Sequence, residues 1–222
     1  MNTQMKVLVV GATGGSGLAA VQQLLEQGHT VTAFARSADK LTLESDRLLK
    51  MRGDVMLQED VDRAVQGQDA VMVILGIAEN PLSVRLWGSR RTPMRVRSQG
   101  TAQLIKAMQK HDVRRLLVQS SYGVGETREM LGWTDRLFFK LLLSPQIEDT
   151  EQQEVLVRDS GLDWVLVQPV HLTDEETGKQ SPYLSLDGET RHMKVSRTQV
   201  GIALSSLLSD STTTQRSVSV SG

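Results

Sequence analysis

Short apolar runs alternate along this chain with segments whose apolar residues recur every three or four positions. The clearest runs are Lys6–Val10, Thr30–Ala35 and residues 70–75 and 163–168. Runs of this length predict buried strands, and the spacing between them predicts amphipathic helices. A regular alternation of strand and helix favours an α/β fold with a doubly wound, mostly parallel sheet. No linker, low-complexity segment or internal repeat interrupts it, so a single Rossmann-type domain over residues 1–222 is expected.

The remaining elements follow from the same patterns. Further strands are expected at Leu48–Arg52, 114–119 and 216–220, and helices at 59–66, 96–111, 148–159 and 200–208, the last capped by Ser196. Asp187-Gly188 predicts either a short hairpin or a strand-turn-strand arrangement of 183–186 and 191–195, after a polar loop at 171–181. For two segments the sequence pattern leaves more than one interpretation. The 77–93 stretch is a functional loop or a solvated insertion, and the apolar 127–143 stretch is a helix over the site, a subunit contact or ordinary core.

Composition excludes several classes of function. The chain has 222 residues, a formal net charge of −1 and no cysteine. Disulfides, thiolate metal sites and cysteine nucleophiles are therefore excluded, and no broad basic field favours nucleic acid. No apolar run approaches the ~20 residues of a membrane span. The polar start leads straight into a strand without a signal peptide, so a cytoplasmic location is expected. A monomer or a weak homodimer is also expected.

Glycines at three-residue spacing join the first strand to the first helix. Gly11, Gly14 and Gly17 follow Val10 directly and precede a helical pattern that ends at Gly28. Such a turn lets the backbone approach a pyrophosphate, which the free N–H groups and the positive helix end then face. The cofactor contacts expected in this turn also include Thr13, Gly15 and Ser16. The alternative is a tight turn without a ligand.

The ends of the next strands carry candidates for the rest of a dinucleotide. Arg36 occupies the position where an acidic residue holds the ribose of NAD, and a cation there accommodates the extra phosphate of NADP. Together with Lys40 it favours NADP(H), unless Arg36 is only a solvated strand end. Asp54-Val55 fits the adenine, although Asp54 is also a possible helix N-cap. Leu75-Gly76 leaves room for a ribose.

Serine and histidine follow the later strands at the same edge. Gln119, Ser120 and Ser121 end the fifth strand, near where a nicotinamide reaches in this topology. His171 follows Pro169-Val170 after the sixth strand, and its imidazole can donate, accept or titrate near neutral pH. The alternatives are strand-end hydrogen bonding for the serines and no role for the histidine. The histidines have no metal-ligand spacing, so no metal site is predicted.

Together these motifs resemble the atypical short-chain dehydrogenases/reductases, the NmrA-like NAD(P)-binding group. The resemblance rests on the glycine turn, Arg36, 53–55, 67–71 with 75–76, Ser120-Ser121, 160–162 and 169–171. Within that family the flavin and biliverdin reductases are most similar. The resemblance implies hydride transfer from NADPH to a small planar acceptor, either a flavin (FMN, riboflavin) or a biliverdin-type linear tetrapyrrole. It places Ser121 at the nicotinamide and His171 beside the substrate, as the catalytic candidates.

The sequence departs from ordinary short-chain dehydrogenases at one catalytic motif. Ordinary short-chain dehydrogenases use Tyr-x-x-x-Lys for proton transfer, but here Tyr122 is followed four places on by Glu126. Carbonyl–alcohol chemistry by that route is therefore disfavoured. The remaining cofactor contacts expected are Gln119, Ser120, Pro169 and Val170. The alternative to an enzyme is a non-catalytic NADP(H)-binding redox sensor that docks a protein partner.

Overall fold

The computed structural model describes residues 4–76, 92–130, 144–175 and 180–222. Its main sheet has eight strands in the spatial order β3 (Leu48–Arg52), β2 (Thr30–Ala35), β1 (Lys6–Val10), β4 (Ala70–Val73), β5 (Arg115–Gln119), β6 (Asp163–Pro169), β10 (Arg216–Ser221) and β8 (Tyr183–Ser185). Neighbouring strands run parallel except β8 against β10. The expected single α/β Rossmann-type fold is confirmed.

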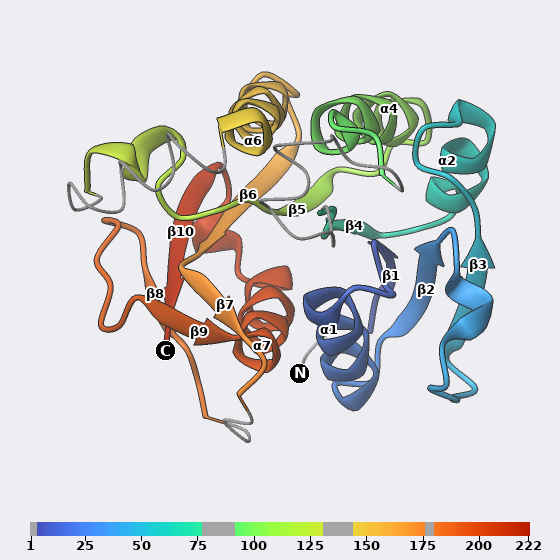
Figure 1. Cartoon of the computed structure of the whole chain (residues 1–222). Coiled ribbons are helices and arrows are strands. Elements are labelled where there is room, and N and C mark those ends of the chain that lie inside the picture. The colour runs from blue at the N-terminus through green and yellow to red at the C-terminus, as the bar shows by residue number, and fades with distance from the viewer. Residues whose placement is uncertain (1–3, 77–91, 131–143, 176–179) are drawn as a thin grey trace.

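Helices cover both faces of the sheet (Figure 1). One face carries α1 (Gly15–Glu26) and α7 (Arg197–Leu208), and the other carries α2 (Gln58–Val65), α4 (Val96–Lys110) and α6 (Ser144–Arg158). Short 3-10 helices lie at η1 (Ala38–Lys40), η2 (Gly125–Met130) and η4 (Ser211–Thr213). Within the ranges described, every helix is too short or too polar to cross a membrane.

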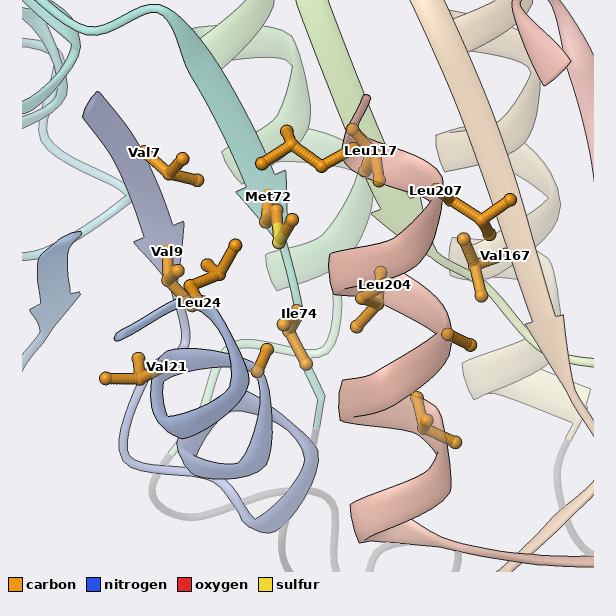
Figure 2. Packing of buried hydrophobic residues seen from close by; sticks show 14 of the residues in the cluster. Val7, Val9, Val21, Leu24, Met72, Ile74, Leu117, Val167, Leu204 and Leu207 are labelled. Carbon is orange, nitrogen blue, oxygen red and sulfur yellow. The ribbon is translucent and has the colours of Figure 1, made fainter. Parts of the chain in front are cut away.

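The period of two along each strand divides the core between these layers. Val7 and Val9 of β1 pack with α1 and α7, whereas Leu8 and Val10 pack with α2 and α4. Figure 2 shows the first of these clusters between the sheet and the two helices. Strands buried on both faces require nearly continuous apolar sequence, which is why the runs were recognisable.

Helices α1 and α7 approach each other closely. A Cβ on Gly201 of α7 would lie 2.6 Å from the carbonyl carbon of Ala19 on α1, so only glycine permits this approach. Ser196 caps α7 as predicted: its side chain accepts a hydrogen bond from the Gln199 N–H, and the Gln199 side chain bonds the Ser196 N–H in return. The start of α7 is thereby fixed next to the glycine turn of α1.

Of the two alternatives at Asp187-Gly188, the strand-turn-strand arrangement is confirmed and the hairpin is wrong. The turn at Gly188 exists, with φ +77°. Its flanking strands have other partners, however: β8 pairs with β10, and β9 (Lys194–Ser196) pairs in parallel with β7 (His171–Thr173). The 171–181 segment is therefore not wholly a loop. A local pattern can locate a turn, but it cannot show that the later strand β10 offers β8 better pairing than its neighbour in sequence does.

The strand predicted at 163–168 extends one residue further than expected. Pro169, the expected strand breaker, is the last residue of β6, a position where proline is tolerated. Of the two segments with more than one interpretation, 77–91 and 131–143 lie outside the described residues. The part of the second segment that is described, η2, is a short 3-10 helix.

Candidate functional site

In the glycine turn, backbone segments from three elements approach one another closely. Gly11 has φ +86° and donates its N–H to the Phe34 carbonyl of β2 at 3.0 Å. A Cβ on Gly11 would overlap the carbonyl oxygen of Ile74, and one on Gly17 would overlap the carbonyl oxygen of Gly11. Glycine at these two positions therefore lets β1, β4 and α1 meet at one point.

Helix α1 begins without a side-chain cap. Its N-cap is Gly14, no side chain accepts its first N–H groups, and its first turn holds no acidic residue. Uncapped N–H groups and the positive helix end together attract an anion. The residues of this turn line a cavity of about 470 Å³, so a phosphate can reach them.

This first cavity runs along the carboxyl ends of β1 to β4. Most of the predicted cofactor residues line it: Gly11, Thr13, Gly14, Gly15, Ser16, Gly17, Arg36, Asp54, Val55, Leu75, Gly76 and Gln119. Lys40 is not among its described lining residues and lies exposed at the end of η1. Other residues that line it were not predicted as site residues from the sequence: Phe34, Ser37, Thr92, Arg97 and Arg197, and also Gly53, which entered only through the family resemblance.

Most of the charged side chains that line the first cavity are cationic. Among the residues described there, Arg36, Arg97 and Arg197 face a single carboxylate, Asp54. Arg36 is exposed at the end of β2, where its guanidinium donates to the Thr92 hydroxyl at 3.1 Å. Arg197 lies against Gly15 at the start of α1 and also pairs with the exposed carboxylate of Asp174 at 2.6 Å. Arg36 and Arg197, together with the uncapped helix, suit a ligand with several phosphates.

Asp54 does not cap a helix, and its carboxylate bonds to the backbone just after it. The N-cap of α2 is Leu57, so the N-cap alternative for Asp54 is wrong. One Asp54 carboxylate oxygen instead accepts from the Met56 N–H at 3.0 Å, which fixes the side chain at the cavity wall. Val55 beside it is 6% exposed and packs against α4 at Gly100.

A second cavity of about 330 Å³ adjoins the first. It is lined at the ends of β5 and β6 by Gln119, Ser120, Ser121, Tyr122, Pro169, Val170 and His171, and on its other side by Gln146, Ile147 and Thr150 of α6. Arg97, Gln119 and Leu172 line both cavities and so mark their junction. The buried Oε1 of Gln119 has no hydrogen-bond partner among the described residues, so an acceptor is available at this junction.

The two serines of the pair have different surroundings. Ser120 is 4% exposed, and its hydroxyl donates to the buried carboxylate of Glu154, which also accepts from Gln168 at 2.9 Å and Arg158 at 3.0 Å. Ser121 is half-buried, and its hydroxyl bonds only locally, to the Tyr122 carbonyl at 3.3 Å. The Ser120 hydroxyl is thus held in a polar network, while that of Ser121 can turn to a ligand at little cost.

His171 is positioned by sheet pairing. It is the first residue of β7, its N–H donates to the Met193 carbonyl at 3.2 Å, and its side chain is exposed beside the second cavity. The predicted residues after β6 therefore reach the same cavity as Ser121.

Tyr122 is unsuited to proton transfer. Its hydroxyl donates to the Gly188 carbonyl at 3.1 Å, and burial raises the pKa of the phenol. A phenol with a raised pKa and a satisfied hydroxyl lacks the activation that a neighbouring lysine gives in ordinary short-chain dehydrogenases. The surroundings of Tyr122 thus give the same indication as the absence of the Tyr-x-x-x-Lys motif: this tyrosine is not set up as a proton donor.

The sequence profile of the NAD(P)H-binding family matches residues 11–211, nearly the whole chain. This chain belongs to that family. An uncharacterised chloroplastic protein of Arabidopsis thaliana is 30% identical over 177 residues, which are 78% of this chain and 61% of that protein. The chain spans only about a third of other curated relatives that it matches, at 34% and 32% of their lengths.

Solved structures agree with the fold of the NAD(P)H-binding family. A short-chain dehydrogenase/reductase from Veillonella parvula in complex with NADP has a TM-score of 0.81 at 17% identity, over 99% of this chain and 95% of that one. A proposed NADH-flavin reductase from Streptococcus pneumoniae has a TM-score of 0.73 at 23% identity, over 97% and 98%. The chain has an NAD(P)H-binding oxidoreductase fold.

Proposed function

We propose that this protein is an NADPH-dependent reductase that transfers hydride to flavins such as FMN and riboflavin, or to biliverdin-type tetrapyrroles. The observation that carries this proposal is that the two cavities adjoin and share Arg97, Gln119 and Leu172 in their linings. A dinucleotide in the first cavity can present its nicotinamide at this junction, and an acceptor can enter the second. The proposed NADH-flavin reductase among the structural neighbours adds support for this acceptor class.

The reaction balances without a protein acid. NADPH gives a hydride to the acceptor and becomes NADP⁺, and the reduced acceptor takes one proton from solvent. The protein then supplies binding and orientation, while the cofactor supplies the hydride chemistry. This fits the satisfied hydroxyl of Tyr122.

We assign the roles at the junction as follows. The Ser121 hydroxyl and the Gln119 amide hold the nicotinamide carboxamide, and His171 contacts the acceptor. Pro169 and Val170 form the apolar wall, both being buried. Arg36 selects NADPH over NADH, because a guanidinium at the end of β2 can pair with the 2′-phosphate.

The test is oxidation of NADPH by the purified protein with FMN, riboflavin or biliverdin, followed by absorbance. Ser121→Ala should lower kcat/KM by about tenfold, the loss of one hydrogen bond. Ser120→Ala is the matched control: it should lower the unfolding temperature, because Glu154 loses a partner, and leave kcat/KM closer to wild type. No turnover with any acceptor, alongside tight NADPH binding, would favour the redox-sensor alternative. A cytoplasmic location and a monomeric or weakly dimeric state remain predictions.

A further inference from the structure

Arg97 is a cation that the sequence interpretation did not single out. It is the second residue of α4, and its half-buried side chain lines both cavities. Its Nη1 donates to the Thr150 hydroxyl of α6 at 2.6 Å, and that hydroxyl donates to the Gln146 carbonyl at 2.8 Å. Thr150 and Gln146 line the second cavity, whereas Nη2 of Arg97 lies beside Gly76 of the first cavity, where an added Cβ would be 3.5 Å from it. The guanidinium therefore spans the junction, with Nη1 held toward the second cavity.

The nearby Asp149 carboxylate accepts hydrogen bonds from groups other than the Arg97 guanidinium. Asp149 of α6 accepts from the N–H groups of Arg97 at 3.0 Å and Ser98 at 3.1 Å, and from the Ser98 hydroxyl at 2.5 Å. Its hydrogen-bonding capacity thus serves the start of α4. Burial lowers the pKa of the Arg97 guanidinium, and Asp149 opposes that shift. Arginine stays charged at neutral pH, so a partly desolvated cation remains at the junction.

The second cavity is otherwise suited to an anion. Its described lining contains no aspartate or glutamate, and Arg97 and His171 are its basic side chains. The first cavity has Arg36, Arg197 and the uncapped start of α1 for the phosphates of a dinucleotide. Arg97 is therefore the cation that the acceptor side depends on.

Resting on the proposed function, we propose that the acceptor carries a phosphate or carboxylate group that Arg97 binds. Arg97 then determines specificity among planar acceptors: it favours those with an anionic side chain over neutral ones with the same ring system. A planar guanidinium can pair bidentately with either kind of anion. FMN and riboflavin test this directly, because they share the isoalloxazine ring and differ in one phosphate.

The experiment measures binding of FMN and riboflavin to the protein–NADP⁺ complex by quenching of flavin fluorescence. NADP⁺ forms the complex without reducing the flavin. Wild-type protein should bind FMN at least tenfold more tightly than riboflavin. Arg97→Gln should weaken FMN binding by about 10- to 100-fold, as expected for a charge-assisted contact, and leave riboflavin and NADP⁺ within about twofold. Arg95→Gln, an exposed residue at the N-cap of the same helix, is the matched control and should change none of these.

Two further measurements keep the inference falsifiable if Arg97→Gln is unstable. Arg97→Lys should retain part of the FMN preference, and on wild-type protein added salt should weaken FMN binding but not riboflavin binding. Equal binding of both flavins by wild type, or an equal loss of both in the variant, overturns the inference. So does a loss confined to NADP⁺, which would assign Arg97 to the cofactor. Turnover of riboflavin separates the outcomes: if it persists, the proposed reductase activity stands without this inference, and if no acceptor is reduced, both fail.

Discussion

Replacing Gly11 by alanine tests whether the glycine turn is required for close backbone approach or only for its dihedral angles. Gly11 has φ +86°, which costs an L-residue about 1–2 kcal/mol. Its new Cβ would also overlap the carbonyl oxygen of Ile74 and lie 2.9 Å from the carbonyl carbon. Both atoms are backbone, so the end of β4 must move, at a further cost of about 1–3 kcal/mol. We expect Gly11→Ala to lose about 2–5 kcal/mol of unfolding free energy, the sum of the two costs.

Gly28 provides a matched control for the dihedral cost. It has φ +89°, but a Cβ there meets nothing within 4 Å. Gly28→Ala should therefore lose only about 1–2 kcal/mol. The gain from a less flexible unfolded chain is common to both variants and cancels in the comparison.

Urea unfolding of both variants gives the two free energies, and titration with NADPH gives the functional consequence. Gly11 lines the first cavity, and Gly28 lies beyond the far end of α1. Gly11→Ala should weaken NADPH by at least tenfold, because shifts of about 1 Å in a positioned site can cost up to about a hundredfold. Gly28→Ala should bind NADPH as wild type does. Equal losses of stability in the two variants would refute the close-approach argument.

Three other substitutions have defined outcomes. Arg36→Ala should weaken NADPH by about 1–3 kcal/mol and leave NADH nearly unchanged in binding titrations, and an equal loss for both would show that Arg36 does not contact the 2′-phosphate. Tyr122→Phe should cost about 1 kcal/mol of unfolding free energy, since the bond to the Gly188 carbonyl is lost, yet keep kcat within about threefold; a large fall in kcat would mean that the phenol takes part in the chemistry. Burial lowers the pKa of His29 below 6.5 in the folded protein, so the unfolded chain binds more protons, and stability should fall as the pH drops below about 6.5. His29→Gln should flatten that part of the pH profile in chemical unfolding, and an unchanged slope would assign it to other groups.

The sequence was most informative where the determining interactions are local. The limits of β1, β2 and β3 agree with the predicted ranges residue for residue. The central strands β1 and β2 are buried on both faces and are therefore nearly continuously apolar, whereas the edge strand β3 is half exposed and is delimited by the Gly53 that follows it. The capping box at Ser196 and the glycine turn are equally local, because each depends on residues within a few positions of one another.

Pairing between distant segments was not predictable in the same way. The residues around Gly188 have the pattern of a hairpin, yet β8 joins β10 and β9 joins β7. The choice depends on which backbone edges the rest of the fold leaves open, and no local pattern contains that information.

By itself, the sequence determined that this protein is an α/β domain with a glycine turn between its first strand and first helix, and with Ser121 and His171 near the same sheet edge. Only the tertiary structure decided which neighbouring residues could serve a ligand. It placed the Ser120 hydroxyl on Glu154 and left that of Ser121 beside the second cavity. It also brought Arg97 of α4 against Thr150 of α6, 53 residues away, at the junction of both cavities. The physical reason is that a motif specifies local backbone geometry, whereas the partners of a side chain depend on how separate helices pack across the sheet.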